Sequence, residues 1–264
     1  MSKLSPIWVL AQQTFQTVIG RRRFAFVLVL ALLPILFVAV GHVLRGAFGL
    51  EVMTPRGIFT TLASMYFPWS SMLMNLVIGL ALVSDEVEGH TLPYLTVRPF
   101  PRSWIIYGKY LALVGLGLVV LPSSLVASYV LAFATEGLAV LSDNLGVLWK
   151  ELSWVALSVP AYGAAFTLIG AIAWRPINLS VGFVMVWEIA FTFVPTALRH
   201  LTITHNLLSM SPQAHKLMTL TDLLGMRSSL WLAALSLAGL SAAYLAAAGL
   251  VFSHRQYVLA DTER

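Results

Sequence analysis

The chain has 264 residues, of which 59% are hydrophobic and 10% are charged, and its mean hydropathy is +0.85. Since a soluble domain carries about 25% charged residues, the composition excludes an ordinary soluble protein and indicates an integral membrane protein. The net charge of +5 fits basic residues retained on the cytoplasmic side of a membrane better than nucleic-acid binding, and the absence of cysteine excludes disulfides and thiol chemistry.

Residues 1–23 predict an amphipathic helix that lies on the inner surface of the membrane. Apolar side chains recur at helical spacing between Ile7 and Ile19, and glutamines and threonines fill most of the remaining positions. We expect Trp8 to lie among lipid headgroups and three consecutive arginines to anchor the helix there; these are Arg21, Arg22 and Arg23. A solvated helical tail is the alternative, and a secretory signal peptide is not expected because no cleavage site follows a short apolar core.

Six apolar runs have the length of about 20 residues that crosses the hydrocarbon core of a bilayer. They cover residues 24–44, 61–83, 110–133, 152–173, 177–197 and 229–252. Residues 198–228 are too polar to cross but partly apolar, so we expect short helices that fold back onto the outer face or re-enter the membrane. The predicted fold class is an all-α integral membrane protein with six transmembrane helices in a single domain, residues 1–264.

The distribution of lysine and arginine predicts the orientation of these spans. With the N-terminus inside, the inner segments hold ten of the 16 basic residues and the outer segments hold six. The positive-inside rule therefore places both termini in the cytoplasm, in a multi-pass protein of the inner (plasma) membrane. The same assignment places residues 84–103, which join the second span to the third, in the cytoplasm.

One carboxylate, Glu188, lies well inside a predicted span. A charge at this depth costs at least about 2.5 kcal/mol, so it should face protein or water, be partnered, or be protonated. Two interpretations stay open: a residue of a substrate path, or an interhelical hydrogen bond that fixes packing. Its expected partners are Ser70, Ser71 and Asn75 of the second span, and Ser71, Asn75 and Glu188 are the candidate path residues.

The sequence contains no phosphate-binding loop, no HExxH and no GxSxG, so we expect no nucleotide, cofactor, metal or catalytic site on this chain. Three histidines of the polar segment, His200, His205 and His215, could hold a metal together with Met210. Solvated loop histidines are the favoured interpretation, because His200 and His205 are five positions apart and do not share one helical face.

Residues 84–103 predict a short amphipathic helix parallel to the membrane, beginning in acidic residues and bounded by glycine and prolines. The acidic start suits a helix N-terminus, and the basic end suits a C-terminus. Such a bounded, charged surface is typical of a docking site for a soluble partner. The predicted contact residues are Asp85, Glu86, Glu88, Gly89, Thr91, Leu92, Tyr94, Leu95 and Arg102.

The stretch SDEVEGHTLPYLTVRPFPRSWIIYGKYLA resembles the membrane subunits of ATP-binding-cassette exporters of the type-2 permease family. Those subunits show an acidic run "DE.E.GTL", then "L...P.SR", then "GK" before the third helix. The matching residues here are Glu86, Glu88, Gly89, Thr91, Leu92, Leu95, Pro99, Arg102, Ser103, Gly108 and Lys109. His90 and Pro93 depart from the pattern.

The resemblance implies a non-catalytic permease subunit that pairs with a second permease subunit, as a homodimer or a heterodimer. Two copies of a cytoplasmic ATPase subunit would bind ATP and Mg²⁺ and hydrolyse the nucleotide, with residues 84–103 as the coupling helix. The second and fifth spans would border the substrate path, whose few charges favour an apolar or amphipathic cargo. The alternatives are a membrane scaffold or assembly subunit without transport and, less favoured, an intramembrane lipid-modifying enzyme.

Overall fold

The computed structural model describes residues 6–19, 22–48, 54–88, 101–134, 136–173, 176–191, 197–210 and 229–254. Every regular element in these ranges is a helix, which confirms the predicted all-helical character. Four of the described helices are long and apolar enough to cross a membrane. They are α2 (Arg22–Phe48), α5 (Arg102–Phe133), α7 (Leu145–Ile172) and α12 (Leu230–His254).

The second and fifth predicted spans correspond to less uniform elements. The second lies inside α3 (Pro55–Glu88), a continuous helix of 34 residues whose described apolar stretch, Trp69–Leu80, is shorter than a span. The fifth corresponds to α8 (Pro176–Gly182), which continues as the π-helix η1 (Phe183–Ala190). The arrangement of six transmembrane helices therefore stays a prediction.

Two of the long helices begin earlier than predicted. The third predicted span begins at residue 110, but α5 begins at Arg102; the fourth begins at residue 152, but α7 begins at Leu145. The predicted spans begin directly after Lys109 and Glu151, because charged side chains are disfavoured in lipid. Both are buried by protein, with 4% and 2% exposure, so the helices continue through them.

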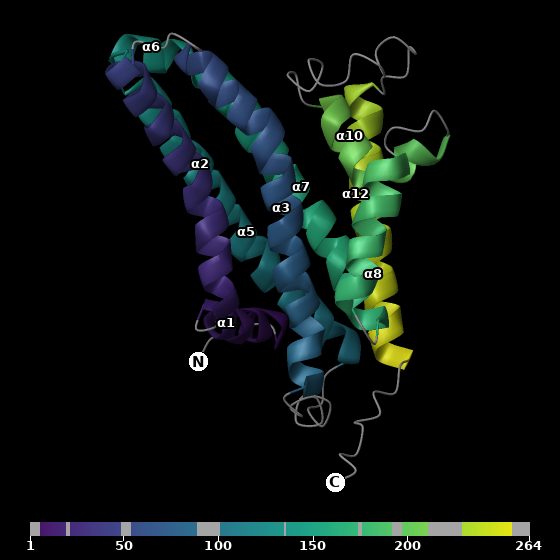
Figure 1. Cartoon of the computed structure of the whole chain (residues 1–264). Coiled ribbons are helices and arrows are strands. Elements are labelled where there is room, and N and C mark those ends of the chain that lie inside the picture. The colour runs from purple at the N-terminus through teal and green to yellow at the C-terminus, as the bar shows by residue number, and fades with distance from the viewer. Residues whose placement is uncertain are drawn as a thin grey trace.

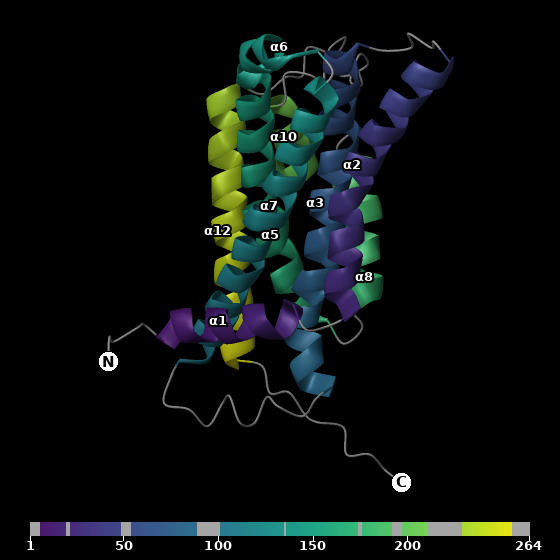
Figure 2. The same cartoon turned by 90° about the vertical axis from the view of Figure 1, so that its left-hand side faces the viewer.

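The long helices lie side by side along one bundle; α2, α3, α5 and α7 alternate in direction, and α12 runs in the same direction as α7 (Figure 1). The short helix α6 (Leu138–Asp143) lies at the end of the bundle where α5 joins α7. At the opposite end, α1 (Pro6–Ile19) lies crosswise to the bundle, near the end of α3, the start of α5 and the end of α12 (Figure 2). This second end is called the α1 end below.

The interior of the bundle is formed by α3, α5 and α7, which pack at very short range. A Cβ at Gly79 of α3 would lie 2.8 Å from the Cβ of Phe166, and one at Gly170 of α7 would lie 3.2 Å from the carbonyl oxygen of Gly79. Small residues at such crossings let helix backbones approach closely, as in many membrane bundles. By contrast, α2 turns large apolar side chains outward, among them Leu32, Leu36, Phe37 and Val43, as a lipid-facing helix does.

The crosswise helix α1 is held by protein contacts at its centre. A Cβ at Gly108 of α5 would lie 2.8 Å from the Cβ of Leu10 and 2.9 Å from the carbonyl oxygen of Ile7. The two backbones therefore cross at Gly108, and Leu10 and Ala11 are buried there. The predicted apolar stripe of α1 thus packs largely on α5, whereas Trp8 remains 56% exposed.

A small apolar cluster at the α1 end joins three helices. It consists of Leu10 of α1, Ile105 and Ile106 of α5, and Ala248 and Phe252 of α12. The cluster is separate from the larger core between the long helices. Displacement of the first turns of α5 would therefore move α1 and the end of α12 with it.

Candidate functional site

Three carboxylates lie at the C-terminal end of α3: Asp85, Glu86 and Glu88. The prediction that they begin a separate helix is wrong, because α3 continues through all three and ends at Glu88. Gly89, which follows, is the residue type that most often ends helices. Carboxylates at a helix C-terminus oppose the helix dipole, at about 0.3–1 kcal/mol each, and a cationic partner would relieve this cost.

Most of the other predicted contact residues lie outside the described residues; these are Gly89, Thr91, Leu92, Tyr94 and Leu95. Arg102 is the first residue of α5. The end of α3 and the start of α5 both lie at the α1 end of the bundle (Figure 2). The acidic residues and the α1–α5 crossing are therefore on the same end of the molecule.

The predicted surface anchors also lie at this end. Trp8 is exposed on α1, and Arg23 is exposed in the first turn of α2. Arg22 is the first residue of α2, and Arg21 lies outside the described residues. Exposed tryptophan and arginine side chains at one end of a bundle are typical of a headgroup layer.

The carboxylate of Glu188 is fully buried and binds the start of another helix, α10 (Ile203–Met210). Its Oε1 accepts a hydrogen bond from the backbone N–H of Ile203 at 3.2 Å. Its Oε2 accepts two from Thr204, the backbone N–H at 2.8 Å and the hydroxyl at 2.7 Å. The Tyr162 hydroxyl of α7 lies 2.9 Å from the Thr204 hydroxyl. Glu188 therefore caps α10 at its positive end.

The expected partners of Glu188 in the second span make different bonds. The hydroxyl of Ser71 lies 2.7 Å from that of Ser158 on α7, and the Asn75 amide donates to the carbonyl of Ser71 at 2.8 Å. Ser70 donates to the carbonyl of Phe67 within α3. Ser71 and Asn75 are thus brought together in the α3–α7 contact, while Glu188 is bonded to α10.

The structure favours the packing interpretation of Glu188. The residue projects from the π-helix η1, and the N–H of Phe191, which follows this helix, donates to the carbonyl of Val186, five residues earlier. π-Helical turns are rare and occur often at functional sites. Residue spacing in the sequence does not indicate the π-helix. It does not indicate the three hydrogen-bond donors of α10 either, since two of them are backbone N–H groups, which do not depend on residue type.

A Glu188→Gln variant is expected to lower the free energy of unfolding by about 1–3 kcal/mol. Glutamine offers one acceptor oxygen where the carboxylate has two, and its NH₂ group would face backbone donors. Thermal unfolding in detergent, with proteolysis of residues 197–210 as a local readout, measures the effect. Thr204→Ser keeps the hydroxyl donor and serves as the matched control. An unchanged unfolding temperature in Glu188→Gln would contradict the capping role.

Two of the histidines considered as metal ligands lie close together. His200 lies in the 3₁₀-helix η2 (Ala197–Leu201) and His205 in α10, with ring centroids 5.2 Å apart. As predicted, the two residues do not share one helical face, because they lie in different helices. The prediction of solvated loop histidines is wrong for His205, which is buried in α10. Burial lowers the pKa of His205 to about 4, with smaller contributions from the charges of Arg199 and His200.

His205 is therefore neutral at physiological pH and packs as a buried side chain. Within the ranges that the structure describes, no group of three or more histidine or carboxylate side chains is placed to hold a metal ion. His215 lies outside those ranges.

In comparisons with known proteins, no family model matches the chain, and no curated protein sequence matches it. The resemblance to type-2 permeases therefore rests on the residues of the 84–112 stretch and on the helical plan. The function has to be inferred from the α1 end of the bundle and its charges.

Proposed function

We propose that the chain is the transmembrane subunit of an ATP-driven exporter of the type-2 permease kind. The observation that carries the proposal is the crossing of α1 over α5 at Gly108, within the YGKY sequence that completes the permease-like stretch. This crossing gives the glycine of the motif a physical role, since any side chain there would meet the backbone of α1. The acidic end of α3 lies at the same end of the bundle.

In this proposal, residues 84–103 receive the motion of a cytoplasmic ATPase. The motion enters α3 through its acidic end and α5 through its first turn. From α5 it reaches α1 and α12 through the cluster around Ile105, Ile106 and Phe252. It reaches α7 through the close contact between Gly79 and Gly170. Closely packed helices transmit such displacements because they have few voids to absorb them.

The complete assembly would contain a second permease subunit and two ATPase subunits that hold ATP and Mg²⁺. The chain would lie in the inner membrane with both termini in the cytoplasm, on the side of α1. An apolar or amphipathic cargo fits best, because the buried charged side chains among the described residues are few: Lys109, Glu151 and Glu188. The carboxylate of Glu188 is occupied by three hydrogen bonds to α10, which fits a path without a charged binding group.

The experiment is purification of the tagged chain from its native membranes. A co-purifying protein with an ATP-binding-cassette sequence, and vanadate-sensitive ATP hydrolysis by the pair in proteoliposomes, are the expected results. Cargo accumulation in sealed inside-out vesicles would then distinguish an exporter from a scaffold. Conversion of a lipid without any ATPase partner would instead favour the intramembrane enzyme and overturn the proposal.

A further inference from the structure

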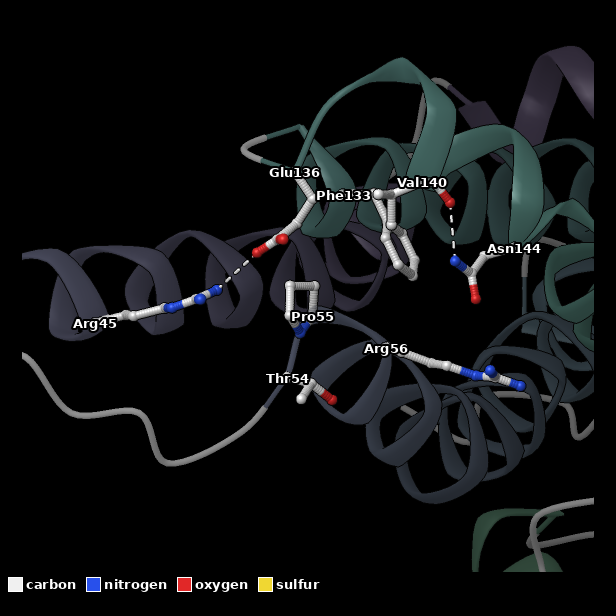
Figure 3. A pocket seen from close by; sticks show the side chains of 8 residues that line it. All are labelled: Arg45, Thr54, Pro55, Arg56, Phe133, Glu136, Val140 and Asn144. Atoms are coloured by element: carbon white, nitrogen blue, oxygen red, sulfur yellow. Dashed lines mark hydrogen bonds and ion pairs between the residues drawn. The ribbon is translucent and has the colours of Figure 1, made fainter.

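A pocket of about 430 Å³ opens at the end of the bundle opposite α1, where α2 ends, α3 begins and α5 turns into α6 (Figure 3). Its floor is apolar and contains the buried Phe133 and Pro55. Its rim carries the charged side chains of Arg45, Arg56 and Glu136. None of these residues belongs to the permease-like stretch, so the pocket is independent of the transport proposal.

The charges on the rim leave one guanidinium group available. Arg45 Nη1 lies 3.0 Å from Glu136 Oε1, so this pair is largely neutralised. Arg56 is exposed, and within the described part of the chain no carboxylate pairs with it. Figure 3 shows its side chain extending away from Arg45, on the side of Asn144. The pocket therefore has a local excess of one positive charge, located at Arg56.

The start of α3 adds a backbone donor to the lining of the pocket. Thr54 accepts the N–H of Gly57 through its hydroxyl at 3.1 Å and the N–H of Ile58 through its carbonyl at 2.9 Å. Pro55 has no N–H, so in the first turn the described contacts leave the N–H of Arg56 for a ligand. A guanidinium and a backbone N–H at a positive helix end form the donor set that suits a phosphate group.

The level of the pocket along the bundle axis points to a lipid headgroup as the source of that phosphate. On α2 the exposed apolar side chains continue up to Val43 and Leu44, which are 65% and 43% exposed and directly precede Arg45. The lipid-facing surface of this helix thus ends at the rim of the pocket. A basic residue at such a boundary lies at the level of lipid headgroups.

We propose that this pocket binds the phosphate of a phospholipid headgroup through Arg56. The headgroup lies over Phe133, and its acyl chains lie along the exposed face of α2. Glu136 opposes the bound phosphate and holds Arg45 away from it.

The test is native mass spectrometry of the detergent-purified full chain with added phosphatidylglycerol or diacylglycerol. Arg56→Gln is expected to weaken phosphatidylglycerol binding about tenfold, the effect of losing one charged hydrogen-bond donor. Glu136→Gln is expected to strengthen binding, because it removes the opposing carboxylate and releases Arg45. Lys150→Gln, which removes an exposed cation of α7 at the same end of the bundle, serves as the matched control and should bind like the wild type. Binding of diacylglycerol, which has no phosphate, should be equal in Arg56→Gln and the wild type.

Equal phosphatidylglycerol binding by Arg56→Gln and the wild type would overturn the proposal, as would an equal loss in Lys150→Gln. A separate arm adds inorganic phosphate to the delipidated protein. Binding of phosphate that depends on Arg56 and is tighter than that of phosphatidylglycerol would show that the site serves a soluble anion, and the lipid assignment would be wrong. If Arg56→Gln folds poorly, the stronger phosphatidylglycerol binding expected for Glu136→Gln still tests the proposal.

Discussion

Replacing both Glu86 and Glu88 with lysine is expected to reduce partner-stimulated ATP hydrolysis at least about tenfold while the chain still inserts and folds. The two carboxylates lie in the last turn of α3, so lysines there would suit the helix dipole better than the native residues do. Helix stability is therefore preserved, and the loss falls on contacts with a cationic surface of the partner. Truncating or reversing a few central contacts usually removes most of the affinity of an interface.

The measurement is ATP hydrolysis by the co-reconstituted subunits in liposomes, with detergent gel filtration as the check on folding. Asp143→Lys is the matched control, because Asp143 is the last residue of α6 at the opposite end of the bundle. It changes charge at a helix C-terminus without touching the proposed contact. Full stimulation in the Glu86→Lys, Glu88→Lys double variant would show that α3 does not carry the coupling contact.

A Gly108→Ala substitution is expected to detach α1 from α5 and to destabilise the protein by about 1–3 kcal/mol, the usual range for overpacking. The new methyl group would lie 2.8 Å from Leu10 Cβ and 2.9 Å from the carbonyl oxygen of Ile7, and a backbone atom cannot turn away. Gly115→Ala, on the same helix, is the control, since nothing lies within 4 Å of its Cβ position. That change should be neutral or stabilising, because alanine favours helices over glycine by about 1 kcal/mol.

The absence of native cysteine gives this prediction a direct readout. A cysteine in place of Ala11, which is buried at 6% exposure, reacts with a maleimide only when α1 lifts from α5. Labelling should be fast in the Gly108→Ala background and slow in the Gly115→Ala background. Equally slow labelling in both would show that the α1–α5 crossing tolerates a side chain at residue 108. The transport proposal would then lose its main structural support.

The sequence predicted the bounds of α12, whose side chains are largely exposed, better than the starts of α5 and α7, which are more deeply buried in the bundle. Helix α12 begins and ends within two residues of the 229–252 expectation, since lipid-facing residues are uniformly apolar. The starts of α5 and α7 were placed too late because Lys109 and Glu151 are buried among other helices. Hydropathy reports the cost of a charge in lipid and contains no information about a protein neighbour.

The candidate site could be predicted only in part for the same reason. Glu188 was identified from the sequence because a carboxylate inside an apolar run is costly wherever it points. Its partners were predicted wrongly, because the chain folds back after η1 and presents backbone N–H groups that no residue type indicates. The close contact of α1 with Gly108 was likewise hidden, since a single glycine in an apolar helix has many causes.

The cap that Glu188 provides to α10 has a consequence for biosynthesis. Its hydrogen-bond donors, Ile203 and Thr204, follow it by 15 and 16 residues, so they leave the ribosome after it. Until they arrive, the helix that carries Glu188 presents an uncompensated carboxylate, which membrane insertion penalises by about 2.5–3.5 kcal/mol. The nascent segment around Glu188 is therefore expected to remain close to the translocon until α10 has been synthesised. A ribosome stalled before residue 203 would leave this part of the protein unassembled.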